Sequence, residues 1–340
     1  MILVERHGGR GVKYILFFWH PKCKLQFGFE CHSYVGVAFE KTCNFKFIKN
    51  LYFRQYKKEI CATVSNLMIW SDNDVANDFT TMKLEDGEQA YHPKFLQCGM
   101  QVYREYQRRL WDSDCTSEIT DGEVQEWHSH IYGNGTIGIF LFDLRGNRIN
   151  SDGEQASDNP LLSDQQWQAF EDFMSNPDLR AVILCSETPF IGEEPMVCKE
   201  KVECNPKMDF LKDHWYFNEE ELHKLVKICF EWKVQGGGLR DLIFVAGDIH
   251  CGVTTVLTDE ESGLQINHYT TSPVTNHVCE FFPPLQGSLN NRFHFNHLPL
   301  GKSFRNYLDV EITLDEDSCD IQAKLIPVSN DIFKNTKYLL

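Results

Sequence analysis

The sequence predicts an α/β fold, a layered β-sandwich flanked by helices. Two patterns indicate it. In the middle of the chain, short apolar runs alternate with amphipathic helical stretches, and after residue 252 strand-like runs follow one another without a helix between them. Alternating strands and helices build a sheet that is covered by helices, and successive strands add further sheet. With 340 residues, 42% of them hydrophobic, the chain can bury a large core.

The individual elements follow from the spacing of apolar residues. Apolar runs predict strands at residues 66–70, 136–142, 180–185 and 242–246. Residues 253–257, 266–271, 307–314 and 321–326 also read as strands, with no helix between them. Apolar residues three and four apart predict helices over residues 91–111, after Ser163, and from Asn218 to the glycine loop at 235–238. Ser163 and Asn218 are each followed three residues later by Gln or Glu, which is the capping-box pattern of a helix N-terminus.

The first sixty residues differ from the rest of the chain. They hold eleven Lys and Arg against four Asp and Glu, in a chain of net charge −16, and they show no clean helix or strand period. We therefore divide the chain into an atypical or incomplete N-terminal segment, residues 1–60, and one domain, residues 61–330. The acidic remainder repels polyanions, which argues against a nucleic-acid partner, and it supplies carboxylates for hard metal ions.

Cysteine usage and hydropathy bear on the compartment. The thirteen cysteines include no Cys-x-x-Cys pair, which excludes the usual zinc-ligand spacings, and their odd number does not suggest a disulfide framework. Reduced thiols, together with the lack of an apolar stretch long enough for a signal peptide or a membrane span, predict a soluble cytoplasmic chain. The sequence does not define an oligomeric state.

Polar side chains gather where the predicted strands end. Residues 70–74, Trp-Ser-Asp-Asn-Asp, follow the first of these strands. In an extended turn Asp72 and Asp74 point the same way, and two carboxylates so placed suit a hard cation. An Asx-rich turn explains the same residues without a metal.

A second cluster, Gly-Asp-Ile-His at residues 247–250, follows the strand at 242–246. In an extended backbone Asp248 and His250 share a face, and a carboxylate with an imidazole is typical of catalytic Zn, Fe or Mn sites. Cys251 would then point away from His250, which argues against a Cys–His dyad. A strand-end turn with a neutral, packed histidine is the alternative interpretation.

Two further segments carry candidate functional residues. Arg145 lies two residues after Asp143, at the end of the strand at 136–142, and an arginine there could hold a phosphate group through two parallel hydrogen bonds. A surface ion pair is the alternative for Arg145. Asp213 lies two residues before Trp215, just ahead of the helix that begins near Asn218.

Taken in chain order, these clusters resemble the PhoD-like (alkaline phosphatase D) metallophosphatases of the calcineurin-like metallophosphoesterase superfamily. The family's Trp-Asp-Asp-His-Asp/Glu motif is similar to Trp-Ser-Asp-Asn-Asp at residues 70–74 of this chain. The other similar motifs are Asp-x-Arg at 143–145, Ser-x-x-Pro-Phe at 186–190, Asp-x-Trp at 213–215, Gly-Asp-x-His at 247–250 and Thr-Ser-Ser/Pro-x-Thr-Asn at 271–276. The resemblance covers about residues 50–315. It implies a double β-sandwich flanked by helices, with metals at the ends of the sheets.

The resemblance also implies an activity, the hydrolysis of a phosphomonoester or phosphodiester substrate at a two-metal site. Two cations about 3.5–4 Å apart would lower the pKa of a bound water and stabilise an in-line displacement. The implied metal ligands are Asp72, Asp74, Asp248 and His250, and the residues do not distinguish Fe, Ca, Mn and Zn.

Three other residues receive roles by the same resemblance. Arg145 would clamp the phosphate, Asn73 would hydrogen-bond the phosphate or the leaving group, and Asp213 would orient the site.

Two departures from the family pattern keep an alternative open. The family's Gly-Asp-Gln-x-Tyr-x-Asp motif, which supplies bridging metal ligands, has no counterpart in residues 1–60. Asn73 stands where the family has histidine, and an amide cannot act as a general acid near neutral pH. The alternative is a catalytically impaired pseudophosphatase that serves as a binding or structural module. An unrelated α/β hydrolase is set aside because the sequence has no Gly-x-Ser-x-Gly.

Overall fold

The computed structural model describes residues 2–5, 11–16, 65–75, 93–115, 126–146, 160–205, 211–272, 278, 286–299 and 304–327. The strands are β1 (Ile2–Glu5), β2 (Gly11–Leu16), β3 (Ser65–Leu67), β4 (His128–Tyr132), β5 (Ile137–Leu141), β6 (Ala181–Cys185), β7 (Asp241–Ala246), β8 (Val253–Asp259), β9 (Gln265–Thr270), β10 (Gln286–Leu289), β11 (Phe293–Pro299), β12 (Asn306–Leu314) and β13 (Cys319–Pro327). The α-helices are α4 (Asp72–Val75), α5 (Pro93–Tyr106), α7 (Asp164–Met174), α8 (Pro195–Cys204) and α9 (Glu219–Gly236). Short 3₁₀ turns are η3 (Arg108–Leu110), η4 (Gly133–Gly135) and η6 (Trp215–Phe217).

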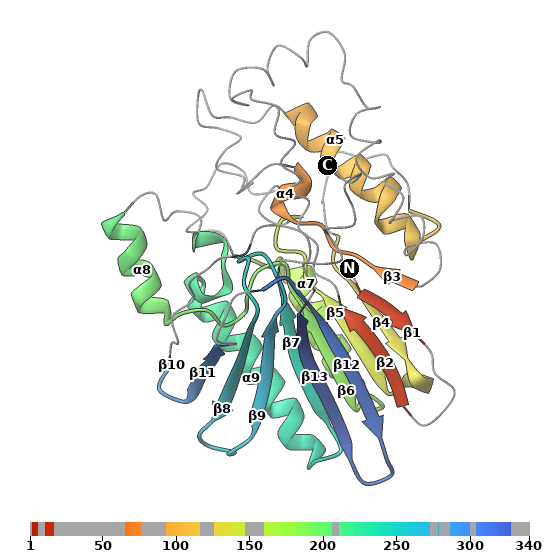
Figure 1. Cartoon of the computed structure of the whole chain (residues 1–340), viewed down its shortest axis with the longest axis vertical. Helices are drawn as coiled ribbons and strands as arrows, with labels where there is room; N and C mark the ends of the chain where they lie inside the picture. Colours follow the sequence, from red (N-terminus) through yellow and green to blue (C-terminus); the bar gives the residue numbers. More distant parts are fainter. Residues whose placement is uncertain are drawn as a thin grey trace.

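These strands form two sheets (Figure 1). The large sheet has the order β10-β11-β8-β9-β7-β6-β5-β4, and the small sheet has the order β13-β12-β2-β1-β3. The large sheet is mixed, because β5, β6, β7 and β9 run parallel while β4, β8, β10 and β11 pair antiparallel to their neighbours. All pairs of the small sheet are antiparallel.

The large sheet buries both of its faces around β6. Val182 and Leu184 belong to a hydrophobic cluster that includes the apolar faces of α7, α8 and α9. Ala181, Ile183 and Cys185 belong to a second cluster, which also contains residues of β12 and β13 in the small sheet. Successive side chains of a strand point to opposite faces, so a strand covered on both sides needs the continuous apolar run that the sequence shows.

The predicted α/β class is confirmed, as a large mixed sheet flanked by helices. The finer prediction of a metallophosphoesterase-type sandwich remains a prediction. The strands predicted at 136–142, 180–185, 242–246, 253–257, 266–271, 307–314 and 321–326 and all three predicted helices are present, with ends shifted by a few residues.

The two predicted capping boxes are only partly right. Ser163 accepts a hydrogen bond from the N–H of Gln166, as predicted. The side chain of Gln166 does not reach back, because it pairs with the backbone N–H and C=O of Asp143 at 2.8 and 2.9 Å. Asn218 occupies the N-cap of α9 without capping through its side chain, which donates instead to the carbonyls of Lys212 and His214.

Several elements were not predicted from the sequence, namely β1, β2, β4, β10, β11 and α8. β1 and β2 lie in the N-terminal segment, where no period was visible, and β2 pairs with β12 in the small sheet. Residues 17–64 lie outside the described ranges, so the proposed boundary at residue 60 remains a prediction.

Two observations concern the predicted compartment. In the part of the chain that the structure describes, no helix is both long and apolar enough to cross a membrane. Free cysteines among the described side chains include the buried Cys185, Cys198 and Cys229. A cytoplasmic location remains a prediction.

Candidate functional site

Four parallel strands of the large sheet end at one edge. Because β5, β6, β7 and β9 run in the same direction, their carboxyl ends meet there, where α/β sheets form their ligand sites. Polar residues follow each strand, namely Asp143 to Arg145 after β5, Ser186 and Glu187 after β6, Gly247 to His250 after β7, and Thr271 and Ser272 after β9.

Arg145 is buried between two carboxylates at this edge. Its Nε donates to Glu187 Oε1, and its Nη1 donates to Asp213 Oδ2 at 2.9 Å. Burial alone lowers the pKa of Arg145, but Glu187, Asp213 and Asp72 together raise it above its ordinary value. Arg145 is therefore a permanent buried cation, and two of the residues predicted from separate motifs, Arg145 and Asp213, are in direct contact.

The predicted extended turn after β3 is wrong. The segment begins the short helix α4 at Asp72, and residues two apart in a helix point in different directions. Asp74 accepts hydrogen bonds from the N–H of Ser71 at 3.0 Å and from Gln107 Nε2 at 2.9 Å, and the latter contact holds it toward the C-terminal end of α5. Asp72 and Asp74 therefore do not share a face.

Asp72 lies on the Arg145 side of α4. Its side chain is buried, and its N–H donates to Glu187 Oε2 at 3.2 Å. Burial raises the pKa of Glu187, Arg145 works against that rise, and the negative charge of Asp72 adds to it. Asp72 also helps to raise the pKa of Arg145, after Glu187 and Asp213. The side chain of Asn73 lies outside the described residues, and its predicted role stays a prediction.

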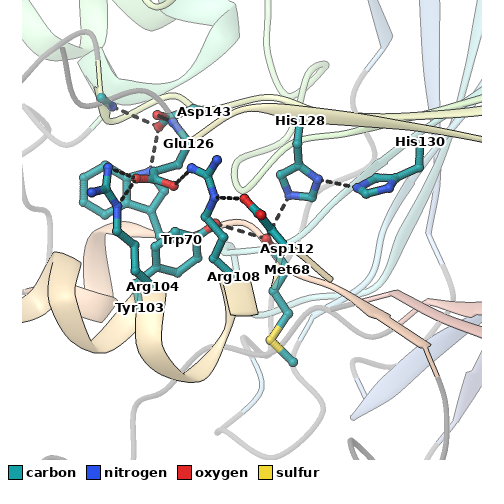
Figure 2. Close-up of polar contacts among 11 residues, drawn as sticks. Met68, Trp70, Tyr103, Arg104, Arg108, Asp112, Glu126, His128, His130 and Asp143 are labelled. Atoms are coloured by element: carbon teal, nitrogen blue, oxygen red, sulfur yellow. Dashed lines mark hydrogen bonds and ion pairs between the residues drawn. The ribbon is translucent and has the colours of Figure 1, made fainter. Parts of the chain in front are cut away.

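Asp143 holds the segments that carry Asp72 and Arg145 together. Its Oδ1 accepts hydrogen bonds from Trp70 Nε1 at 2.7 Å and from the N–H groups of Arg145 and Gly146, each at 2.9 Å. Its Oδ2 accepts from the N–H of Glu126 at 2.7 Å. Burial raises the pKa of Asp143, and these hydrogen bonds lower it again because they favour the carboxylate. Figure 2 shows Trp70 and Glu126 converging on Asp143.

The carbonyl of Met68 fixes the same segment from another side (Figure 2). It accepts from Tyr103 OH at 3.2 Å and contacts His128 Nε2 at 2.9 Å. Since a carbonyl only accepts, His128 carries its proton on Nε2, and its Nδ1, 2.8 Å from His130 Nε2, accepts from that nitrogen. Burial lowers the pKa of His128 to about 3 and that of His130 to about 4, so both rings are neutral near pH 7.

Glu126 links this network to α5 and η3. Its fully buried carboxylate pairs with Arg104 at 2.7 Å and with Arg108 Nη1. Arg108 also pairs with Asp112 at 3.0 Å, on a more exposed side (Figure 2). Burial raises the pKa of Glu126, and the two arginines work against that rise. These contacts anchor α5 and η3 beside the Trp70 segment.

The backbone at residues 247–250 is not extended, contrary to the prediction. Asp248 and His250 have φ of 67° and 59°, in the left-handed region, so the argument that they share a strand face is wrong. A side chain in this region costs about 1–2 kcal/mol. The other described non-glycine residues with positive φ are all asparagines, Asn134, Asn290 and Asn291. Backbone strain of this kind is often found at functional sites. It is therefore a second reason to treat residues 247–250 as part of a candidate site.

The buried ring of His214 is under the electrostatic influence of four of the predicted residues. Burial lowers its pKa, Asp248, Asp213 and Asp72 raise it, and Arg145 lowers it. These four charged residues come from four separate segments and act on one buried ring. Asp74 lies on the α5 side instead, in contact with Gln107. His250 is half-buried and lies two residues after Asp248 in the sequence.

Glu187 and His214 were not predicted as site residues. Glu187 lies inside the segment 186–190, and His214 lies between Asp213 and Trp215, so both fall within motifs noted in the sequence. The signal was their position at the end of a buried strand or beside a predicted site residue, but nothing local indicates that Glu187 contacts residue 72.

The described residues do not by themselves form the metal centre that the resemblance implies. Within the described ranges, no group of three or more His, Cys, Asp or Glu side chains is arranged so that it could hold a metal ion. Asp72 and Asp248 each act electrostatically on Glu187 and on His214, as does the positive charge of Arg145.

Comparison with known proteins gives little further information. No protein-family model matches the chain, and no curated protein matches it. One similar solved structure, "Structure of PhoD", has 12% sequence identity and a TM-score of 0.47 over 77% of this chain. The chain spans about half of that structure's length, since the match covers 54% of it. A likeness at this level supports no conclusion about the family or the activity of this chain.

Proposed function

We propose that this chain binds phosphate esters at the strand-end site around Arg145 and hydrolyses them. The supporting observation is a buried cluster at the strand ends, in which Arg145 contacts Asp213 at 2.9 Å and also Glu187, and Glu187 accepts from the N–H of Asp72. An arginine at such a site suits a phosphate group, because its planar fork matches the phosphate oxygens. The proposal includes a phosphomonoester or phosphodiester substrate and no nucleic-acid partner.

The roles of individual residues form part of this proposal. Arg145 binds the phosphate group, with Asp213 orienting it through the 2.9 Å contact. Asn73 hydrogen-bonds the phosphate or the leaving group. The proposed metal ligands are Asp72, Asp248 and His250, for Fe, Ca, Mn or Zn; Asp74 is left out because Gln107 holds it on the α5 side.

A second candidate function is a pseudophosphatase that binds phosphate or a partner without turnover. Two observations favour it. Arg145 already pairs with both Glu187 and Asp213, and the described residues contain no three-ligand metal group. A scaffold with this arrangement can hold an anion beside a buried guanidinium without activating a nucleophile.

Metal content and hydrolysis, measured on the same preparation, separate the two candidates. We expect the hydrolase to carry two metal equivalents by elemental mass spectrometry and to hydrolyse p-nitrophenyl phosphate or its diester. His250→Ala should lose metal and activity, whereas His223→Ala, which removes a histidine on α9 that contacts Asn290, should keep both. One equivalent or none, with no hydrolysis by the unaltered chain, would favour the pseudophosphatase. Full metal occupancy in His250→Ala would remove His250 from the ligand set.

A further inference from the structure

We infer that Glu187 is a positioning residue that holds the Asp72 segment and Arg145 in one arrangement. The inference rests on the proposed function, and it concerns a residue to which the motifs assign no role. Glu187 follows β6 and is buried, with 6% of its surface exposed.

Glu187 contacts three of the segments that carry the proposed site. Its Oε1 accepts from Arg145 Nε, and its Oε2 accepts from the N–H of Asp72 at 3.2 Å. Its backbone carbonyl accepts from the N–H of Gly247 at 3.1 Å. The segments after β3, β5 and β7 therefore meet at one residue, and Asp72 is 115 positions away from it in the sequence.

Only a carboxylate satisfies both side-chain contacts. The two donors reach different oxygens, so both ends of the group must accept. Glutamine has the same shape but presents one oxygen and one NH₂ group. In Glu187→Gln the single oxygen stays with the charged Arg145, which is the stronger donor, so the NH₂ group faces the N–H of Asp72 and that contact is lost.

This geometry assigns Glu187 an indirect role. Both of its oxygens are engaged by protein donors, so it acts through Arg145 and the Asp72 segment rather than on the substrate. A displacement of about 1 Å at a catalytic group can lower the reaction rate on the order of 100-fold. Losing one of these contacts should therefore lower the rate.

The test compares Glu187→Gln with Glu221→Gln. Glu221 is a matched control because it also accepts on both oxygens, from the N–H of Leu161 and from Trp167 Nε1, away from the site residues. Hydrolysis of p-nitrophenyl phosphate is measured at a temperature where circular dichroism shows both variants fully folded. We expect Glu187→Gln to lower kcat at least about tenfold with KM changed less than about threefold, and Glu221→Gln to leave kcat within about twofold.

A second readout does not depend on activity. Hydrogen–deuterium exchange of the peptide covering residues 68–75 reports on the N–H of Asp72, which should exchange faster in Glu187→Gln and unchanged in Glu221→Gln. If the unaltered chain hydrolyses no phosphate ester, the proposed function fails, and this exchange still decides the role of Glu187. Equal exchange in the two variants, or an unchanged kcat of Glu187→Gln in an active chain, overturns the inference.

Discussion

Two buried glutamates are neutralised in different ways. Glu126 pairs with two arginines, Arg104 and Arg108, whereas Glu187 shares the single Arg145 with Asp213. Removing one partner of a buried ion pair leaves the other charge uncompensated, which is why such losses are costly. Glu126 therefore serves mainly to fix α5 and η3, and Glu187 lies in a cluster where negative charge is in excess over the one arginine among the described contacts.

Glu126→Gln should destabilise the fold by about 3 kcal/mol, because two arginines lose their buried carboxylate. Asp112→Asn is the matched control on the same arginine, since Arg108 and Asp112 are 22% and 25% exposed. It should cost less than about 1 kcal/mol. Urea denaturation of both variants measures the difference, and equal costs would show that the Glu126 network does not anchor α5 and η3.

The gathering of polar residues where strands end was more predictable than their orientation. Arg145 and Asp213, from separate motifs, are in direct contact, and Glu187 joins Arg145 to Asp72, while the roles given to these residues remain predictions. The directions given to Asp74 and to Asp248 with His250 were wrong, because each prediction assumed extended backbone where the chain forms α4 or adopts positive φ. The contacts of Glu187 could not be predicted from its neighbours in the sequence, because the N–H group that it binds belongs to the distant Asp72.

At the scale of elements, β5 approaches α7 closely through a glycine. A Cβ on Gly138 would lie 2.5 Å from Phe173 Cζ and 2.9 Å from a methyl carbon of Leu179. This contact therefore fixes the distance between β5 and α7. The segment that follows β5 carries Asp143 and Arg145. Close packing of this kind leaves no room for an added methyl group.

Gly138→Ala should therefore destabilise the chain by about 1–3 kcal/mol through overpacking. Phe173→Leu makes space beside the new methyl group, so the double variant should recover part of the loss relative to the sum of the two single changes. Thermal or urea unfolding of all four proteins in the cycle measures the coupling. Additive effects would mean that the strand moves away from α7 without cost.

The strands with apolar runs, β5, β6 and β7, were predicted. Strands of mixed composition were predicted only in part, since β8, β9, β12 and β13 were found and β4, β10 and β11 were missed. β11 does alternate, with Phe293, Phe295 and His297 buried between more exposed residues. The alternating period is present in the sequence, but it was not recognised because two histidines and an asparagine interrupt the apolar residues. The short strand β1 pairs with β3, and β2 pairs with β12. These pairings join distant segments, so a pattern within residues 1–16 does not predict them.

At the scale of the whole molecule, several histidines are kept neutral by the fold. His268 is fully buried between Phe190 and Phe244, and among the described residues its ring nitrogens have no hydrogen-bond partner. Burial lowers its pKa to about 3, and His128 and His130 are lowered likewise. In the unfolded chain a histidine titrates near pH 6.5. Below that pH the unfolded state binds protons that the folded state does not, so stability falls as the pH drops from about 6.5 toward 4.

His268→Phe isolates one of these contributions. The free energy of unfolding of the variant, relative to the unaltered chain, should rise as the pH falls below 6.5, by up to about 1.4 kcal/mol per pH unit. Any cost of fitting the larger ring is independent of pH and does not affect this slope. Urea midpoints at pH 7, 6 and 5 measure it, and parallel curves for the two proteins would show that His268 takes up a proton in the folded state.

The pairing of β2 with β12 has a consequence for how the chain acquires its structure. The parallel strands β5, β6 and β7 lie within residues 137–246, whereas the small sheet joins residues 11–16 to residues 306–314. During synthesis the early strands must wait until β12 has left the ribosome, and pairings between such distant segments form slowly because the long intervening loop must close first. The apolar face of β5, β6 and β7 that the small sheet covers is the surface left open in that interval, and it is where a nascent chain would need protection from aggregation.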